Sequence, residues 1–155
     1  LFWQEILSKP LLYLSFYLKK NRAEYYDLLM KVRLKGAWED WITFFLKGIS
    51  ETSEEAAKTA REVIQLKEDL LTRLHKNSIS SVYSVKLIDL LFQTPLVNVK
   101  DVSGKLNISK EAANELVKKF EKVGVLQEIT GKQRYKKYSF KEYIEIIARG
   151  TKDKS

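Results

Sequence analysis

Apolar side chains in the first half of the chain recur every three or four positions, as they do in a helix packed on one face. Pro10 suits a first helical turn because its missing N–H group needs no partner there, so a helix is expected to follow it to about Leu18. Asn21 with Glu24 three residues later is close to a capping box, and Gly36 is a typical helix stop. The segment between Asn21 and Gly36 therefore predicts a second helix.

The helical spacing of apolar residues continues after Gly36. Large apolar and aromatic residues occupy positions 38–49 at helical spacing. Thr52 followed by Glu55 repeats the helix-start signal, and apolar residues carry a separate long helix from there to about Lys76. At Asn77 the helical period lapses into short polar residues, which predicts a domain boundary.

The second half begins with three shorter helical patterns. The first covers residues 82–92 and ends before Pro95, which disfavours helical backbone in the residue ahead of it. Two more are expected over residues 98–106 and 109–123, and each opens on a residue type that caps helices, an asparagine and a serine. The short segment between them predicts a tight turn.

Short strands follow these helices. The pattern predicts a strand over residues 125–130, a turn at 131–133, a strand over 134–140 and a closing helix over 141–149. Three helices followed by a small antiparallel hairpin is the order of a winged helix-turn-helix. The expected fold is mainly α, with a helical domain at 1–77, a winged helix-turn-helix domain with a small β-hairpin at 78–150, and a frayed tail at 151–155.

The positive charge is concentrated in the second half. The 155 residues contain 28 Lys and Arg against 20 Asp and Glu, a net charge of +8. Residues 1–77 hold 13 basic and 11 acidic side chains, net +2, whereas residues 78–155 hold 15 and 9, net +6. A basic domain favours an acidic partner, and nucleic acid is one such partner.

The residue types that carry much of enzyme chemistry are scarce. The sequence has no cysteine, which excludes disulfides and thiolate metal sites, and its single histidine, His75, suits a helix end better than a catalytic site. No acidic residues have a metal-binding spacing, and the longest apolar runs are far shorter than the roughly 20 residues of a membrane span. For this chain we expect no metal, no bound cofactor, no membrane contact and a cytoplasmic location.

Two surfaces of the second domain carry side chains suited to DNA. The second helix of a helix-turn-helix enters the major groove, and here its outward face offers lysine for guanine or phosphate and asparagine for adenine. The hairpin carries cations without intervening acids, which suits a phosphate backbone. The predicted nucleic-acid-binding residues are Lys110, Glu111, Asn114 and Lys118 on the helix and Lys132, Gln133, Arg134 and Lys136 on the hairpin. Winged helices also dock proteins, so a target protein stays an equal alternative to duplex DNA.

Three consecutive strings in the first half resemble a known family: LLYLSFY at 11–17, NRAEYYDLL at 21–29 and GAWEDWITFFL at 36–46. Their order is similar to that in the C-terminal part of Fic-domain proteins, over residues 1–75. Bacterial members of that family commonly carry a winged helix after the Fic core. The resemblance implies a parent protein that transfers AMP from ATP to a hydroxyl side chain of a target protein, with Mg²⁺ on the phosphates.

The catalytic loop of that family, HxFx(D/E)GNGR, does not occur in this sequence. The resemblance therefore implies a catalytically inactive piece that begins after the loop and packs on the upstream Fic core of its parent. It also implies that Tyr25 and Tyr26 line the adenine pocket of the parent, and that Arg33 lies where another polar adenine neighbour is often found.

Two functions are expected from these observations. In the first, the chain is the non-catalytic C-terminal portion of a Fic-family AMP-transferase, and its winged helix binds DNA or docks a target protein. In the second, it is a stand-alone winged-helix transcription regulator whose first half is a dimerisation module. The second function predicts a homodimer formed through the aromatic stripe of residues 38–49.

Overall fold

The computed structural model describes residues 13–149, which divide into two compact units, one reaching to Arg61 and one over Glu62–Ile147. Both units are mainly helical, as the sequence predicted. The predicted helix start at Pro10 and the predicted frayed tail, 151–155, lie outside the described residues.

The first unit contains a helical segment over residues 13–20, the helix α2 (Arg22–Lys35) and the first part of α3 (Trp38–Lys76). Gly36 ends α2 with a left-handed φ of 65°, and its N–H donates to the carbonyl oxygen of Val32 at 2.9 Å, which confirms the predicted stop. The predicted capping box at Asn21 is wrong. The Asn21 amide Nδ2 donates instead to the carbonyl oxygen of Tyr17 at 2.9 Å, so this side chain serves the end of the preceding helix.

A small core holds the helices of the first unit together. Tyr17, Leu28 and Phe44 are buried there, and the rings of Tyr17 and Phe44 lie 5.4 Å apart. Gly48 of α3 lies against Tyr17, where an added Cβ atom would lie 2.6 Å from Cε1 of the tyrosine ring. Glycine is therefore needed at this position because the ring occupies the space of a side chain.

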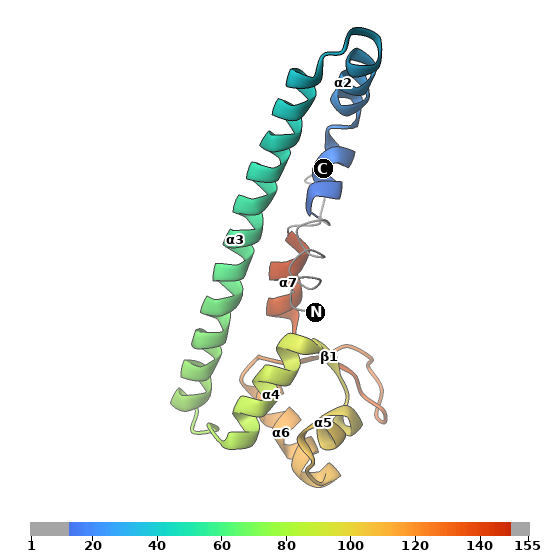
Figure 1. The fold of residues 1–155 in the computed structure, drawn as a ribbon. Helices are drawn as coiled ribbons and strands as arrows, with labels where there is room; N and C mark the ends of the chain where they lie inside the picture. Colours follow the sequence, from blue (N-terminus) through green and yellow to red (C-terminus); the bar gives the residue numbers. More distant parts are fainter. Residues whose placement is uncertain (1–12, 150–155) are drawn as a thin grey trace. The chain divides into compact units, whose positions relative to one another are not determined.

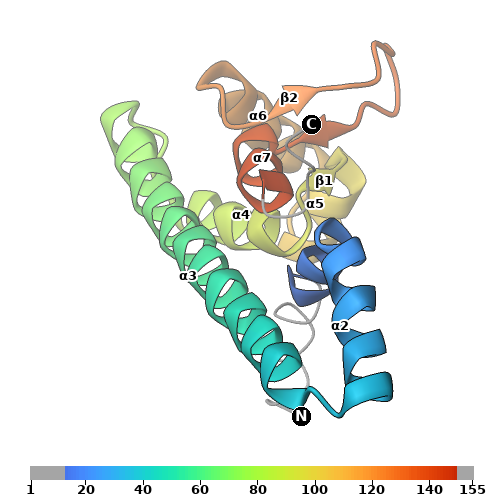
Figure 2. The ribbon, with the colours of Figure 1, turned by 90° about the horizontal axis from the view of Figure 1, so that it is seen from above.

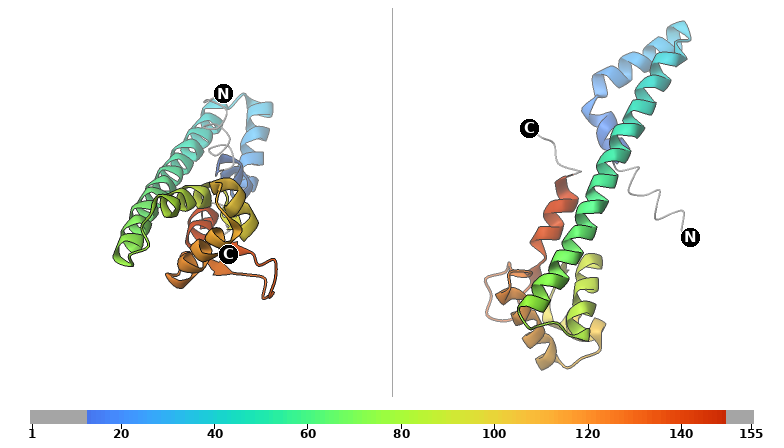
Figure 3. Two further views of the ribbon diagram at one scale, coloured as in Figure 1. Left: turned by 90° about the horizontal axis from the view of Figure 1, so that it is seen from below. Right: turned by 90° about the vertical axis from the view of Figure 1, so that its left-hand side faces the viewer.

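α3 is one uninterrupted helix of 39 residues (Figure 3), about 58 Å long at the helical rise per residue. The predicted separate start at Thr52 is wrong. The Thr52 hydroxyl donates to the carbonyl oxygen of Gly48 at 2.7 Å, a bond directed back along the same helix. A threonine can make this bond or cap a new helix, so its position in the sequence alone did not distinguish the two.

The second unit contains the last part of α3 and a series of shorter elements around one core (Figure 1). In chain order these are α4 (Val82–Gln93), β1 (Leu96–Val97), α5 (Val99–Leu106), α6 (Lys110–Lys122), β2 (Gln127–Glu128), β3 (Tyr138–Ser139) and α7 (Lys141–Arg149). The four predicted helices agree with α4, α5, α6 and α7 to within a residue or two. The strand β1 was not predicted.

Capping side chains set the starts of the two central helices. Asn98 Oδ1 accepts from the backbone N–H of Asp101 at 3.0 Å, and the Asp101 carboxylate accepts from the N–H of Asn98 at 3.0 Å, which completes a capping box for α5. Ser109 Oγ accepts from the N–H of Ala112 at 3.1 Å at the start of α6. Both predicted caps are confirmed, and each such cap typically contributes about 1 kcal/mol.

The strands form an antiparallel sheet in the order β1-β3-β2. β3 is the central strand, so Tyr138 lies opposite residues of both neighbours. The predicted strands over 125–130 and 134–140 are far longer than the observed ones, which have two residues each. Residues 129–137 form a loop instead, which we call the wing.

The core of the second unit includes the end of α3. Leu66, Leu70 and Leu74 of that helix are buried together with residues from α4 to α7. Arg73 also forms a two-point ion pair with the Glu142 carboxylate, at 2.7 and 3.3 Å. The packing of this unit thus begins upstream of Asn77, while the division into folding domains at that residue stays a prediction.

The order α4, β1, α5, α6, β2, wing, β3 confirms the predicted winged helix-turn-helix. The wing projects beyond the helices of this unit in Figure 2. It and the exposed side of α6 are the two surfaces to which the predicted nucleic-acid-binding residues belong.

Candidate nucleic-acid interface

The turn between α5 and α6 is fixed by local hydrogen bonds. Asn107 adopts a left-handed φ of 54°, a conformation that asparagine tolerates better than most residues. The N–H of Ile108 donates to the carbonyl oxygen of Ser103 at 3.1 Å, and the Ser103 hydroxyl donates to the carbonyl oxygen of Ile108 at 2.7 Å. This double link holds α6 at a defined position after α5, as a helix-turn-helix requires.

α6 separates a buried face from an exposed one, as its sequence predicted. Ala113, Leu116, Val117 and Phe120 are buried in the core of the second unit. The predicted contact residues occupy the other side, where Lys110, Glu111 and Lys118 are exposed and Asn114 is half-buried.

The exposed side of α6 is close to electrically neutral, because three glutamates offset most of the charge of the four lysines between residues 110 and 122. Lys118 Nζ lies 3.6 Å from a carboxylate oxygen of Glu115. Hydrogen bonds from the Glu111 backbone N–H and from the Ser109 hydroxyl hold the pKa of Glu111 below its usual value, so this glutamate is ionised at neutral pH. α6 can make specific polar contacts, but it adds little net attraction for a polyanion.

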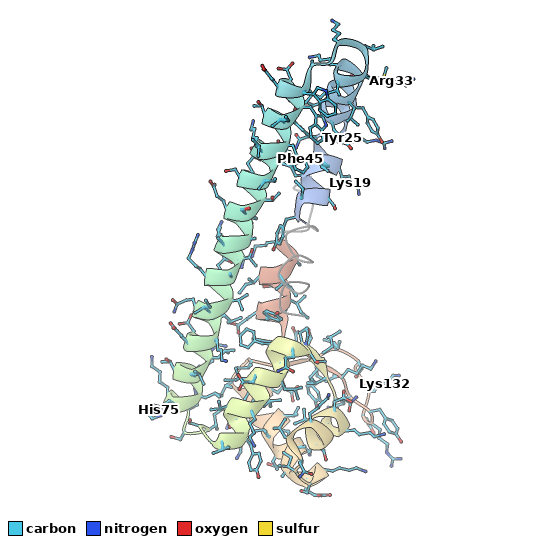
Figure 4. The ribbon with its side chains drawn as sticks, viewed as in Figure 1. Lys19, Tyr25, Arg33, Phe45, His75 and Lys132 are labelled. Atoms are coloured by element: carbon cyan, nitrogen blue, oxygen red, sulfur yellow. The ribbon has the colours of Figure 1, made fainter. Side chains whose placement is uncertain are left out.

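The wing is different, because its cations are not offset by acids. Every residue from 131 to 137 is exposed. Figure 4 shows Lys132 directed away from the helices of the unit. Among the described residues, Lys132 and Arg134 have no ion-pair partner within 4.0 Å. Arg134, Lys136 and Lys137 were expected to lie along a strand, but they lie on the loop together with Lys132, and Lys141 is the first residue of α7.

The base of the wing is held by the Glu128 carboxylate. It accepts hydrogen bonds from the Thr130 hydroxyl, from the Thr130 N–H at 2.7 Å and from the Gly131 N–H at 3.1 Å. The Thr130 hydroxyl bond is the largest cause of a lowered Glu128 pKa, followed by the backbone bonds and the positive charge of Lys136. The role of Glu128 was not predicted from the sequence. The signal that could have indicated it is an acidic residue two positions before a Thr-Gly turn.

The residues implied by the Fic resemblance lie in the first unit. Tyr25 is half-buried, and its ring centroid lies 5.5 Å from that of Tyr26 and 6.4 Å from that of Phe44. The ring of Tyr26 also receives the Arg22 guanidinium at 5.4 Å, whereas Arg33 is exposed further along α2 (Figure 4). These contacts are those of helix packing and surface pairing, and an adenine-binding role for Tyr25, Tyr26 and Arg33 stays a prediction.

Other kinds of site are not found in the part of the chain that the structure describes. Residues 13–149 contain no group of three or more His, Cys, Asp or Glu side chains placed to hold a metal ion. Within the same residues, no helix has the length and apolar character needed to cross a membrane. His75 is exposed near the end of α3, as expected for a surface residue (Figure 4).

A surface depression of about 680 Å³ lies at the C-terminal end of α6. Its lining residues are Asn77, Ile79, Lys119, Lys122, Val123 and Gly124. None of the predicted nucleic-acid-binding residues lines it, so it is separate from the surface formed by the first turns of α6 and the wing.

A comparison with protein families matches the part of the chain that carries α6 and the wing. Residues 85–139 match the family model of the HTH DNA-binding domain. The match begins in α4 and ends at the last residue of β3, so it covers both α5–α6 and the whole wing. An HTH DNA-binding domain at these positions supports DNA binding by the second unit.

Proposed function

We propose that the second unit binds duplex DNA, with the first turns of α6 in the major groove and the wing on the phosphate backbone. The observation that supports this most strongly is the wing, an exposed loop that contains basic residues and no acidic ones. It lies inside the segment that matches an HTH DNA-binding domain. Phosphate contacts supply most of the affinity in such an interface, and base-edge contacts supply the sequence preference.

The roles divide between the two surfaces. Lys132, Arg134 and Lys136 are the phosphate contacts, because all three are exposed on a loop that contains no acidic residue. Lys110 and Asn114, in the first two turns of α6, are the base-reading contacts, since lysine suits guanine and asparagine suits adenine. Glu111 suits the cytosine amino group, which donates a hydrogen bond.

Fluorescence anisotropy of the full chain with a labelled random-sequence duplex tests this function. Affinity should fall linearly on a log–log plot as salt is raised from 50 to 300 mM, because bound counterions are released. Selection from a duplex library should then show altered sequence preference for Asn114→Ala and little change for a matched change outside the interface, Asn77→Ala. Binding that does not respond to salt, or no binding, would refute the proposed contact with DNA and leave protein docking as the alternative.

We infer that the first unit is the C-terminal portion of a Fic core. The support is the resemblance of three consecutive strings, together with large apolar side chains that the described unit leaves exposed: Trp38, Ile42, Leu46 and Ile49. Side chains spaced this way on one side of α3 suit packing against further protein. In this reading the parent enzyme uses ATP and Mg²⁺ in the cytoplasm, and the present chain transfers no AMP when supplied with both.

The same apolar side chains also suit the stand-alone regulator, in which they would join two copies. Light scattering separates these readings. A stable dimer that dissociates on changing Ile42 and Leu46 to serine favours the regulator, and a monomer that binds an added Fic core favours the AMP-transferase parent.

A further inference from the structure

The depression at the C-terminal end of α6 has the size of a binding cleft. Its volume of about 680 Å³ lies within the roughly 300–1,000 Å³ of ligand pockets. Two segments of the second unit line it, residues 77 and 79 after α3 and residues 119 and 122–124 at the end of α6. Lys110 and Lys122, the first and last residues of α6, are about 18 Å apart along the helix axis. The depression is therefore distinct from the surface proposed to contact DNA.

One part of the depression is apolar. Ile79 and Val123 are half-buried and pack against the core of the second unit. Backbone hydrogen bonds fix both residues, since the N–H of Ile79 donates to the carbonyl oxygen of Leu74 at 3.1 Å and the N–H of Val123 to that of Lys119 at 3.2 Å. A preformed apolar surface of this kind suits one apolar side chain of a ligand.

The other part is positively charged. Lys119 and Lys122 are exposed and lie one helical turn apart on the same side of α6. Within residues 13–149, neither lysine has an ion-pair partner closer than 4.0 Å. Glu121 lies between them in the sequence but does not line the depression. Its charge acts on Tyr138 instead, because the pKa of Tyr138 is raised by burial and then by Glu121. The two positive charges are therefore open to an anionic ligand.

The polar groups favour the carboxylates and amides of a peptide over a phosphate group. Phosphate sites typically gather several unpaired backbone N–H groups, whereas the N–H groups of Ile79, Val123 and Gly124 all donate to carbonyl oxygens of the protein. The negative end of the α6 dipole also disfavours a compact dianion near the helix axis. Asn77 adds an acceptor for a peptide N–H: its Nδ2 donates to the carbonyl oxygen of Arg73 at 2.8 Å, and its Oδ1 accepts no hydrogen bond from the described residues.

We propose that this depression binds an acidic peptide segment of a partner protein. One apolar side chain of the segment packs on Ile79 and Val123, and carboxylates on either side of it pair with Lys119 and Lys122. The site goes beyond DNA binding, because it uses none of the residues proposed for that function and requires no DNA. Charge complementarity selects an acidic partner, and the apolar contact selects among acidic segments.

NMR titration of the ¹⁵N-labelled full chain tests the proposal, with a synthetic peptide that places one leucine between two pairs of glutamates. The amide signals of Asn77, Ile79 and Gly124 should shift as the peptide binds, while those of the wing should not. A second peptide with glycine in place of leucine should bind roughly tenfold more weakly, because it loses the burial of one apolar side chain. Shifts confined to the wing, equal affinity of the two peptides, or no shift at millimolar peptide would overturn the proposal.

A pair of charge variants locates the contact. Changing Lys119 and Lys122 together to glutamine should weaken binding of the leucine peptide roughly tenfold, the scale of two exposed ion pairs at about threefold each. The matched control changes Lys100 and Lys105, two exposed lysines of α5 in the same unit, and should leave the affinity unaltered. Equal losses in the two variants would show attraction by net charge alone and overturn the proposal. No DNA is present in these titrations, so this site and the proposed function fail or stand separately.

Discussion

Replacing Lys132, Arg134 and Lys136 together with alanine should weaken duplex binding by about 500-fold at 0.1 M monovalent salt. All three side chains are exposed on the wing, so each is free to neutralise one phosphate. Each phosphate contact adds about 0.9 to the slope of log affinity against log salt, so the three add about 2.7. Between 1 M salt, where the counterion effect vanishes, and 0.1 M salt, that slope corresponds to about 500-fold in affinity.

Anisotropy titrations at several salt concentrations measure both quantities, the affinity and its slope. A second triple variant, with Lys19, Lys31 and Lys35 of the first unit changed to alanine, controls for overall charge. Each variant removes three positive charges from a net charge of +8, leaving +5. If both variants lose the same affinity, net charge alone explains the binding and the assignment of the wing is refuted. An unchanged slope in the wing variant would refute it as well.

Three further changes probe the structure around these surfaces. Glu128→Gln should lower the protection factor of the Thr130 amide, which compares its exchange rate with the intrinsic rate at the same pH. Acid should lower this protection factor too, but only below the usual carboxyl pKa of 4.5, because the lowered pKa keeps the carboxylate ionised until then. Phe140→Ala, in a fully buried position, should cost about 3–5 kcal/mol in the urea unfolding of the second unit. Gly48→Ala should lower the melting temperature of the first unit despite its higher helix propensity, since the Cβ would meet the Tyr17 ring at 2.6 Å.

The helices of the second unit were predictable because their limits are encoded locally. The caps at Asn98 and Ser109 and the break before Pro95 each act within a few residues, so no knowledge of distant partners is needed. The buried face of α6 followed in the same way, from helical spacing alone. Local signals failed at Thr52, where a hydroxyl bonded back along the helix instead of starting a new one.

The sheet was harder to predict because it depends on distant residues. β1 has two residues and exists only because Val97 pairs with Tyr138, far along the chain. The tyrosines among the basic residues of 134–138 suggested a long strand, but only Tyr138 has a core to face. Without a partner strand, the remaining residues form the wing, and the exposure of Tyr135 could not be read from the pattern.

The pairing of β1 with β3 also has a consequence for how the protein is made on the ribosome. At about 5–20 residues per second, β3 emerges several seconds after β1. During that interval α4, α5 and α6 can form from local contacts, while β1 stays an open edge that other nascent chains could pair with. Because β1 spans only Leu96–Val97, this edge offers few hydrogen bonds to a wrong partner. The wing is set in place only when β3 pairs with β1 and β2, so a newly made chain becomes able to bind DNA only after Tyr138 and Ser139 have left the ribosome.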